Sequence, residues 1–165
     1  MPTSSEPLID AAHAAFIQGA VGISAAACGS DRMPALVRAL GCRVSADRRC
    51  VAVFVSATQA AQLLKCIRDN GAVAVVFSEP STHRTVQLKG ADATAGELQE
   101  GDLQRLQAYR DAFAQEVAPH GFDRHMIQTL LSHPPADIVA LAFTPTAAFS
   151  QTPGPKAGAP LEAGA

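Results

Sequence analysis

Short runs of hydrophobic residues recur along the chain and switch between helix-like and strand-like spacing. The clearest helical pattern covers Thr58–Asn70, where apolar side chains stand at i, i+3, i+4 and i+7: Ala60, Leu63, Leu64 and Ile67. Thr58 can cap the first turn, and Asn70-Gly71 provides a left-handed stop. This segment is therefore predicted to be an amphipathic helix with one buried face.

Three further segments have helical patterns and boundary residues. Ser5 can cap a first helix with Pro7 in its opening turn, and Pro119 and Gly121 end the third. The predicted helices are Ser5–Gln18, Leu98–Val117 and Asp123–Ser132.

Six segments are predicted to be strands because they are short, apolar and bounded by polar turns: Val21–Ala27, Ala35–Ser45, Cys50–Ser56, Ala72–Ser78, His83–Ala93 and Asp137–Phe149. The polar turn at 46–49 joins two of them as an antiparallel hairpin. Short strands with few crossover helices favour an antiparallel barrel over a doubly wound sheet. We expect an α+β fold, mainly β with peripheral helices.

The chain is long enough for one domain, which we place at 1–150 with a helical insertion at about 97–133. The segment 151–165 contains three prolines and three glycines, and we expect it to be an extended or mobile tail.

Composition narrows the class of protein. Hydrophobic residues make up 48% of the chain, enough for a core without a disulfide or metal. The net charge of −2 argues against non-specific nucleic-acid binding. No apolar run approaches the ~20 residues of a membrane span. The N-terminus lacks the pattern of a secretory signal, and the four cysteines form no C-x-x-C pair, so we expect buried, reduced thiols and a cytoplasmic protein.

Common catalytic and metal motifs are missing from the sequence. There is no phosphate-binding P-loop, no G-x-G-x-x-G and no G-x-S-x-G. His120, His125 and His133 match no zinc spacing, so we predict no metal site.

Arginines within predicted strands are the strongest chemical signal. Arg38 and Arg43 are five residues apart in one predicted strand, which would place them on opposite faces, and Arg84 begins another polar strand. An arginine among apolar residues needs a partner, either an acid from elsewhere or an anionic ligand such as a phosphate. Ser56 and Thr58, at the start of the Thr58–Asn70 helix, offer hydroxyls for a second anion site or for ordinary capping.

The order and spacing of three motifs within Val21–Asp92 resemble the flavin-binding split-barrel family of pyridoxamine 5′-phosphate oxidase. The first motif is H-R-T-V-Q-L-K-G, ending at Gly90. The second is R-A-L-G-C-R, which begins at Arg38 and follows Pro34. The third is V-F-V-S followed by a helix ending in Asn-Gly.

This resemblance implies a six-stranded antiparallel split β-barrel that forms a homodimer and binds flavin mononucleotide (FMN) at the subunit interface. Arg38 and Arg43 would approach the ribityl chain or the ring, and the backbone of Ala39 and Leu40 would face the ring edge. Val55 and Ser56 would line the phosphate end, near Thr58. Arg84 and Thr85 would contact the cofactor from the second strand pair.

The sequence departs from the oxidase at two positions that bear on function. The Ser-Arg-Lys cluster that grips phosphate in the oxidase is replaced by Thr58–Gln62, which contains no cation, and Thr85 replaces a glutamine. The resemblance therefore implies a related small-molecule oxidoreductase with a substrate of its own, not the oxidase itself. Two alternatives remain open: a haem- or deazaflavin-binding module, for which His83 is the histidine within the resembling segment, and a cofactor-free dimeric structural protein.

Overall fold

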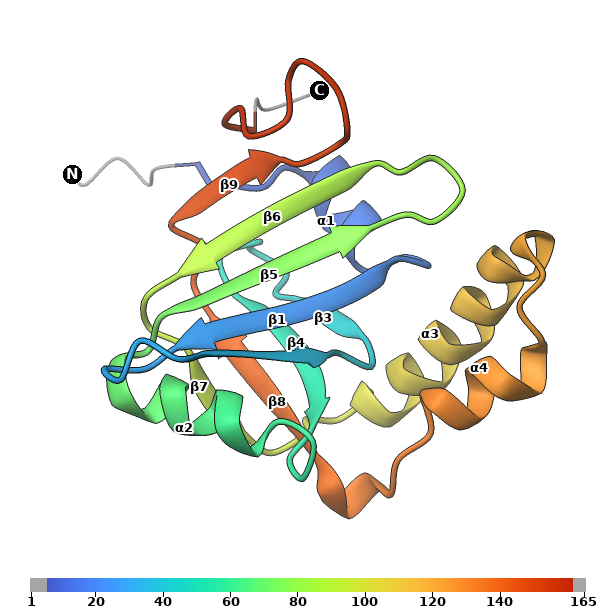
Figure 1. Cartoon of the computed structure of the whole chain (residues 1–165), viewed down its shortest axis with the longest axis horizontal. Coiled ribbons are helices and arrows are strands. Elements are labelled where there is room, and N and C mark those ends of the chain that lie inside the picture. The colour runs from blue at the N-terminus through green and yellow to red at the C-terminus, as the bar shows by residue number, and fades with distance from the viewer. Residues whose placement is uncertain (1–5, 162–165) are drawn as a thin grey trace.

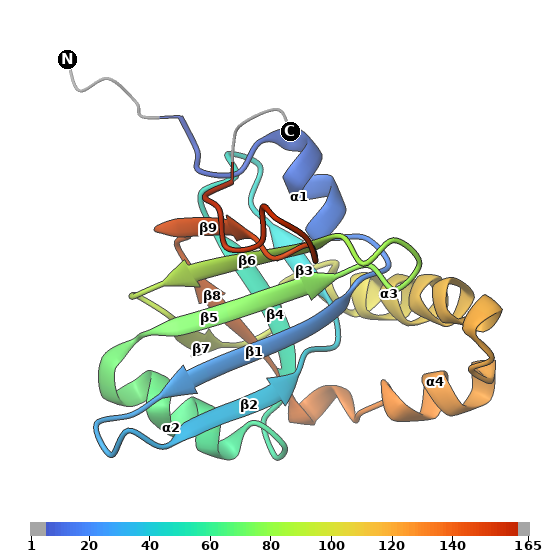
Figure 2. The same ribbon diagram turned by 45° about the horizontal axis from the view of Figure 1, so that its top comes forward.

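The computed structural model describes residues 6–161, which form two antiparallel sheets with helices around them (Figures 1 and 2). The five-stranded sheet has the order β2-β1-β5-β6-β9, with bounds Pro34–Arg38, Gly22–Cys28, Val73–Ser78, Thr85–Gly90 and Ala147–Ser150. The four-stranded sheet has the order β3-β4-β8-β7, with bounds Cys42–Val44, Val51–Ser56, Ile138–Phe143 and Thr94–Gly96. The predicted antiparallel split barrel with peripheral helices is confirmed.

The structure corrects the number of strands, because two predicted strands each divide between the two sheets. Residues 35–45 form β2 and β3, and residues 137–149 form β8 and β9. At the first division, the Ala39 N–H bonds to Ile23 of the five-stranded sheet, while the Leu40 N–H bonds to Phe54 of the four-stranded sheet. Gly41 has a φ of +150°, a conformation that L side chains rarely adopt, and it lets the chain cross there.

The third additional strand, β7, is short and exposed, so its sequence carries no alternation that a pattern could reveal. The predicted β3–β4 hairpin is confirmed, with Cys42 opposite Val53 and Val44 opposite Val51.

Four α-helices lie around the sheets, and each begins later than predicted (Figure 1). They are α1 (Ala11–Ile17), α2 (Ala61–Asn70), α3 (Asp102–Val117) and α4 (Arg124–Leu130), with short 3-10 turns at Ala118–His120 and Pro135–Asp137. Asp10 caps α1 by accepting from the His13 N–H at 2.7 Å, while the predicted cap Ser5 lies outside the described residues. The predicted stop of α2 is confirmed, since Gly71 has a φ of +69°.

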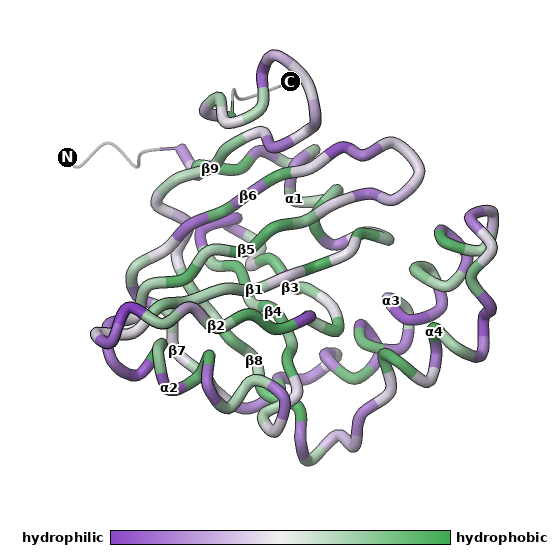
Figure 3. Tube along the Cα trace, in the orientation of Figure 1, coloured by the Kyte–Doolittle hydropathy of each residue, from purple (hydrophilic) through white to green (hydrophobic). Residues whose placement is uncertain are grey.

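The core fills the space between the two sheets. Every residue of β4 is buried, and Phe54, Phe77 and Phe143 are the largest fully buried side chains. In Figure 3, hydrophobic residues concentrate along the strands, whereas the helices mix hydrophobic and hydrophilic positions. Cys42 and Cys66 are buried as expected, and burial raises the pKa of the Cys42 thiol, but Cys28 is exposed.

The outer face of the five-stranded sheet is left without a helix over it (Figure 1). Side chains on this face alternate with the buried core positions along each strand, and Leu36 on it is 72% exposed. We call this surface the open face; it includes Ser24, Ala26, Leu36, Arg38, Val76, Ser78, Thr85, Gln87 and Phe149.

The segment after β9 differs from the expected extended tail. Residues 151–161 fold back along the sheet, where the Ser150 N–H bonds to Ala159, the Gly158 N–H to Ser150 and the Leu161 N–H to Ala148. These bonds make the segment part of the fold.

Within residues 6–161, none of the helices is long and apolar enough to span a bilayer.

Candidate functional site

The structure separates the nine predicted site residues into groups with different surroundings. Arg38 lies at the end of β2, where its guanidinium stacks over the Phe113 ring of α3 at 4.9 Å. Its Nε is buried without a hydrogen-bond partner, and Arg38 forms no ion pair with an acid among residues 6–161. An aromatic face stabilises the cation only partly, so Arg38 retains capacity for an anion.

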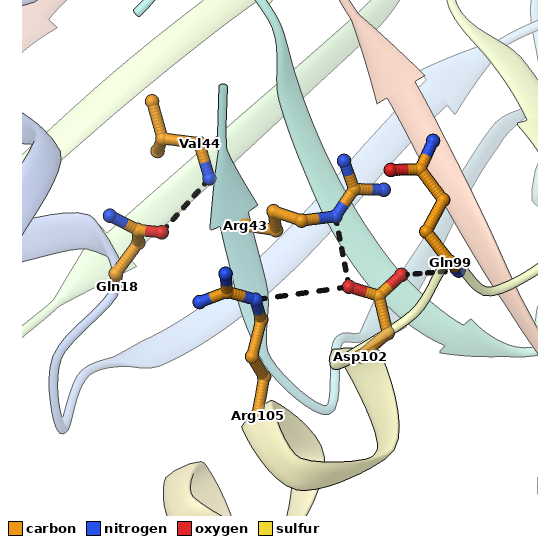
Figure 4. Close-up of polar contacts among 6 residues, drawn as sticks. All are labelled: Gln18, Arg43, Val44, Gln99, Asp102 and Arg105. Carbon is orange, nitrogen blue, oxygen red and sulfur yellow. Dashed lines mark hydrogen bonds and ion pairs between the residues drawn. The ribbon is translucent and has the colours of Figure 1, made fainter. Parts of the chain in front are cut away.

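Arg43, in contrast, has an acidic partner inside the protein (Figure 4). Its Nε donates to Oδ1 of Asp102 at 2.9 Å, and the Asp102 side chain is fully buried. The Gln99 N–H donates to the other carboxylate oxygen at 2.8 Å, and Arg105 lies 3.9 Å from the first. Of the two partners that the sequence left open for an arginine in a strand, an acid or an anionic ligand, Arg43 therefore has the acid. It also lies on a different sheet from Arg38, so the two do not occupy opposite faces of one strand.

Ala39, Leu40 and Val55 are core residues, with exposed fractions of 0%, 3% and 0%. The N–H groups of Ala39 and Leu40 already donate to the carbonyls of Ile23 and Phe54. In the described chain these residues form the crossing between the two sheets.

Ser56 and Thr58 are already occupied by a carboxylate of the chain. The Ser56 hydroxyl donates to Oδ2 of Asp137 at 2.5 Å, and the Thr58 hydroxyl donates to Oδ1 at 2.6 Å. The Thr58 N–H donates to the same Oδ1 at 3.0 Å. The hydrogen bonds from Ser56 and Thr58 lower the pKa of Asp137. The expected phosphate position at this turn thus holds an internal anion, and α2 itself begins later, with Ala60 as its N-cap.

Arg84 and Thr85 line an open cleft at the start of β6. The cleft has a volume of about 350 Å³ and is also lined by Lys156 from the C-terminal segment. The Arg84 guanidinium stacks over Phe16 of α1 at 4.3 Å. The Thr85 hydroxyl lies 2.8 Å from that of Ser78, on the open face.

Strand register brings Arg38 and Thr85 to the same end of the open face. Arg38 is opposite Ser24 of β1, Gly22 of β1 is opposite Ser78, and Ser78 is opposite Thr85. A Cβ on Gly22 would lie 4.0 Å from an Arg38 guanidinium nitrogen and 3.6 Å from the Ser78 carbonyl oxygen, so the backbone there is close to both. We call this region the polar end; it consists of Gly22, Ser24, Arg38, Ser78, Thr85 and Gln87.

Sequence reasoning missed the polar residues that lie between the predicted ones, above all Ser24 and Ser78. Each is a polar residue at an outward position of a strand whose other residues are apolar, and this alternation is the signal that could have found them. Lys156 was missed because a lysine in a Pro/Gly-rich segment looks like a solvated tail residue.

Solved structures share this fold at low sequence identity. HupZ of Group A Streptococcus is similar with a TM-score of 0.55 and 14% identity, covering 91% of this chain and 100% of that one. An F420 reductase is similar with a TM-score of 0.53 and 17% identity, covering 81% and 92%. A pyridoxamine 5′-phosphate oxidase-related FMN-binding protein of Nostoc punctiforme has a TM-score of 0.46 and 17% identity, covering 83% and 77%.

These likenesses confirm the split-barrel fold that the resemblance in sequence implied. No family model matches the chain. A search of curated proteins likewise finds no match.

Proposed function

We propose that this chain is a homodimeric, FMN-binding flavoprotein of the pyridoxamine-phosphate-oxidase-like type, a small-molecule oxidoreductase of the cytoplasm. The observation that carries the proposal is the polar end. It joins two predicted cofactor residues, Arg38 and Thr85, on the uncovered face of a split barrel. The fold is compatible with a flavin-type cofactor, since an F420 reductase has a similar fold.

The described residues fit a flavin-type cofactor in one region and not in another. At the polar end, the guanidinium of Arg38, which forms no ion pair within residues 6–161, and the hydroxyl of Ser24 on the neighbouring strand offer donors to an electron-rich ring or a ribityl chain. At Ser56 and Thr58, the Asp137 carboxylate would repel a phosphate. Arg43 is committed to Asp102. We therefore assign cofactor contacts to the polar end and not to these residues.

A bound flavin would supply hydride chemistry, and the chain would position it. Arg38 would orient the cofactor and compensate negative charge. Ser24 would donate a hydrogen bond from the floor of the site.

A second copy of the chain is the proposed cover for the open face. This face carries exposed or half-buried apolar side chains such as Leu36, Val76 and Phe149. Covering them stabilises association by about 25 cal/mol per Å² of apolar surface removed from water. It would also exclude water from the polar end, where electrostatic contacts then become stronger.

The test is the visible spectrum of freshly purified protein, followed by titration with FMN. We expect the oxidised flavin bands to copurify, or FMN to bind with a Kd below about 100 μM. Arg38→Ala should weaken FMN binding about tenfold or more, while Arg38→Lys should recover part of the loss. Arg68→Ala is the matched control, because Arg68 is exposed on α2. Absence of flavin binding by the wild-type protein contradicts the proposal.

The same spectrum distinguishes the other ligands. A deazaflavin would show its own absorbance in place of the FMN bands. Haem would show a Soret band; its loss in His83→Ala would point to axial ligation by that histidine.

A second candidate function is a cofactor-free dimeric structural protein. The Asp137 carboxylate already accepts the hydrogen bonds that Ser56 and Thr58 could give to a phosphate, and this favours the structural candidate. In that case Arg38→Ala would change stability, and no variant would change ligand binding.

A further inference from the structure

The cleft beside the start of β6 combines Arg84 and Thr85, which the resemblance assigns to the cofactor, with residues that it does not assign, above all Lys156. We call it the C-terminal cleft. It lies between α1, β6, β9 and the segment 151–161, and its volume of about 350 Å³ is comparable with that of small-molecule sites, roughly 300–1,000 Å³. Its polar lining consists of His13, Arg84, Thr85, Ser150, Thr152 and Lys156.

Among the described residues, the lining of the C-terminal cleft contains two cations, Arg84 and Lys156, and no carboxylate. Neither Arg84 nor Lys156 forms an ion pair with an acid within the described part of the chain. Asp10, which caps α1, lies 2.8 Å from Nδ1 of the lining residue His13. Two other clefts in residues 6–161 have Asp69 and Asp92 in their lining, whereas the cleft beside Arg110 also lacks an acid but contains no second Arg or Lys. Two unpaired cations in one concave site favour an anion.

Arg84 is held in place before any ligand arrives. Its guanidinium stacks over Phe16 at 4.3 Å. Its backbone belongs to a tight turn in which the Glu79 N–H bonds to the Arg84 carbonyl and the His83 N–H bonds to Glu79. Stacking covers one face of the guanidinium and leaves the N–H groups around its edge, which is the geometry for bidentate binding of an oxyanion.

Lys156 stands on a loop that is fixed to the barrel. The Gly158 N–H bonds to Ser150 at 2.7 Å, and the Ala159 N–H bonds to the Lys156 carbonyl at 3.0 Å. The Thr85 N–H donates to the Thr152 hydroxyl at 3.0 Å, which joins the loop to β6. Because this loop is already ordered, placing Lys156 against a ligand costs less conformational entropy than it would on a free tail.

We propose that the C-terminal cleft binds a phosphate monoester through Arg84 and Lys156, with a hydroxyl donor from Ser150. A phosphate monoester carries nearly two negative charges at neutral pH, which matches two cations better than a single carboxylate does. The phosphate has two possible sources: the cofactor itself or a separate phosphorylated small molecule. A cofactor bound at the polar end could place its phosphate in the C-terminal cleft, because Thr85 belongs to both regions. Only this cofactor alternative rests on the proposed function.

Inorganic phosphate is the probe for the site. Isothermal titration calorimetry should show that inorganic phosphate binds to the wild-type protein. Lys156→Ala and Arg84→Ala should each weaken it about tenfold or more, since hydrogen bonds between charged groups are among the strong ones. Lys65→Ala is the matched control, because Lys65 is an exposed lysine on α2. Lys156 is exposed as well, so its removal keeps the test valid should Arg84→Ala fail to fold.

Paired titrations with FMN and riboflavin separate the two sources. If the cofactor's phosphate occupies the cleft, Lys156→Ala weakens FMN binding and leaves riboflavin binding unchanged. If a separate molecule occupies it, inorganic phosphate still binds to the flavin-loaded protein. Phosphate binding without any flavin binding supports the cleft and refutes the proposed function. If neither phosphate nor FMN binding to the folded variants depends on Lys156 and Arg84, the cleft proposal is wrong.

Discussion

Replacing Asp102 with alanine tests whether Arg43 is a structural residue. The Asp102 carboxylate is fully buried and Arg43 is 17% exposed, so removal of the acid leaves a largely covered guanidinium without an anion. It also leaves the Gln99 N–H without its acceptor. Breaking a buried ion pair costs about 3–5 kcal/mol. Because Arg43 retains some contact with water, we expect a loss near the lower limit, about 3 kcal/mol.

Urea unfolding measures this loss. With a denaturant slope of about 1–3 kcal/mol per M, Asp102→Ala should lower the midpoint by roughly 1–3 M. The control is Asp111→Ala, which breaks the Arg124–Asp111 pair, in which both side chains are substantially exposed. Exposed pairs contribute little, so this midpoint should hardly move. Equal shifts in the two variants would refute the structural role of Arg43.

The paired replacement of Arg43 by methionine and Asp102 by leucine completes this test. Removing both charges together leaves neither partner buried alone, so the double variant should be clearly more stable than Asp102→Ala. Its FMN affinity should match that of the wild-type protein, because the site proposed above does not use Arg43. A selective loss of FMN binding in this folded double variant would return Arg43 to the cofactor site.

Three further predictions concern single residues. Burial raises the pKa of Tyr109, the chain's one tyrosine, to about 12, so an ultraviolet pH titration of the folded protein should show its ionisation well above pH 10. The free energy of unfolding should fall as pH rises above 10, because the tyrosine of the unfolded chain ionises first. Ionisation at pH 10 in the folded state would contradict the burial of Tyr109. Gly71→Ala should destabilise the protein by more than about 1 kcal/mol, because φ is +69° and a Cβ would lie 2.6 Å from the Ala91 carbonyl oxygen. Gly96→Ala is the control, since a Cβ at Gly96 would have nothing within 4 Å. Equal urea midpoints for the two variants would refute the reasoning. Hydrogen bonds from Ser56 and Thr58 lower the pKa of Asp137, so its contribution to stability is present above pH 3.8 and is lost as pH falls through the lower pKa of the folded state. Asp137→Asn should therefore reduce the dependence of the urea midpoint on acid pH. An unchanged dependence would count against these hydrogen bonds.

Local signals in the sequence were enough for much of the fold. Asn70-Gly71 predicted the end of α2 because a left-handed residue is a local requirement. The polar turn at 46–49 predicted the β3–β4 hairpin for the same kind of reason. The division of residues 35–45 between two sheets could not be predicted, because the apolar pattern continues across Gly41 and only hydrogen bonds to distant strands reveal the crossing.

Long-range partners decided the roles of the predicted site residues. Arg43 pairs with Asp102, 59 residues later, and Ser56 bonds to Asp137, 81 residues later. Periodicity specifies which face a side chain occupies but not which distant side chain meets it there. The sequence therefore predicted where cations would stand, and the tertiary structure decided which of them were already neutralised.

The folded-back C-terminal segment supplies one side of the C-terminal cleft but none of the nine described strands. A premature stop codon just after Ser150 would spare all nine described strands and yet delete Lys156, along with Thr152 and the outer wall of the cleft. Such an allele would encode every described strand but would lack Lys156, through which the C-terminal cleft is proposed to bind phosphate. A truncating mutation would thus remove the proposed phosphate site without any substitution in the β-sheets.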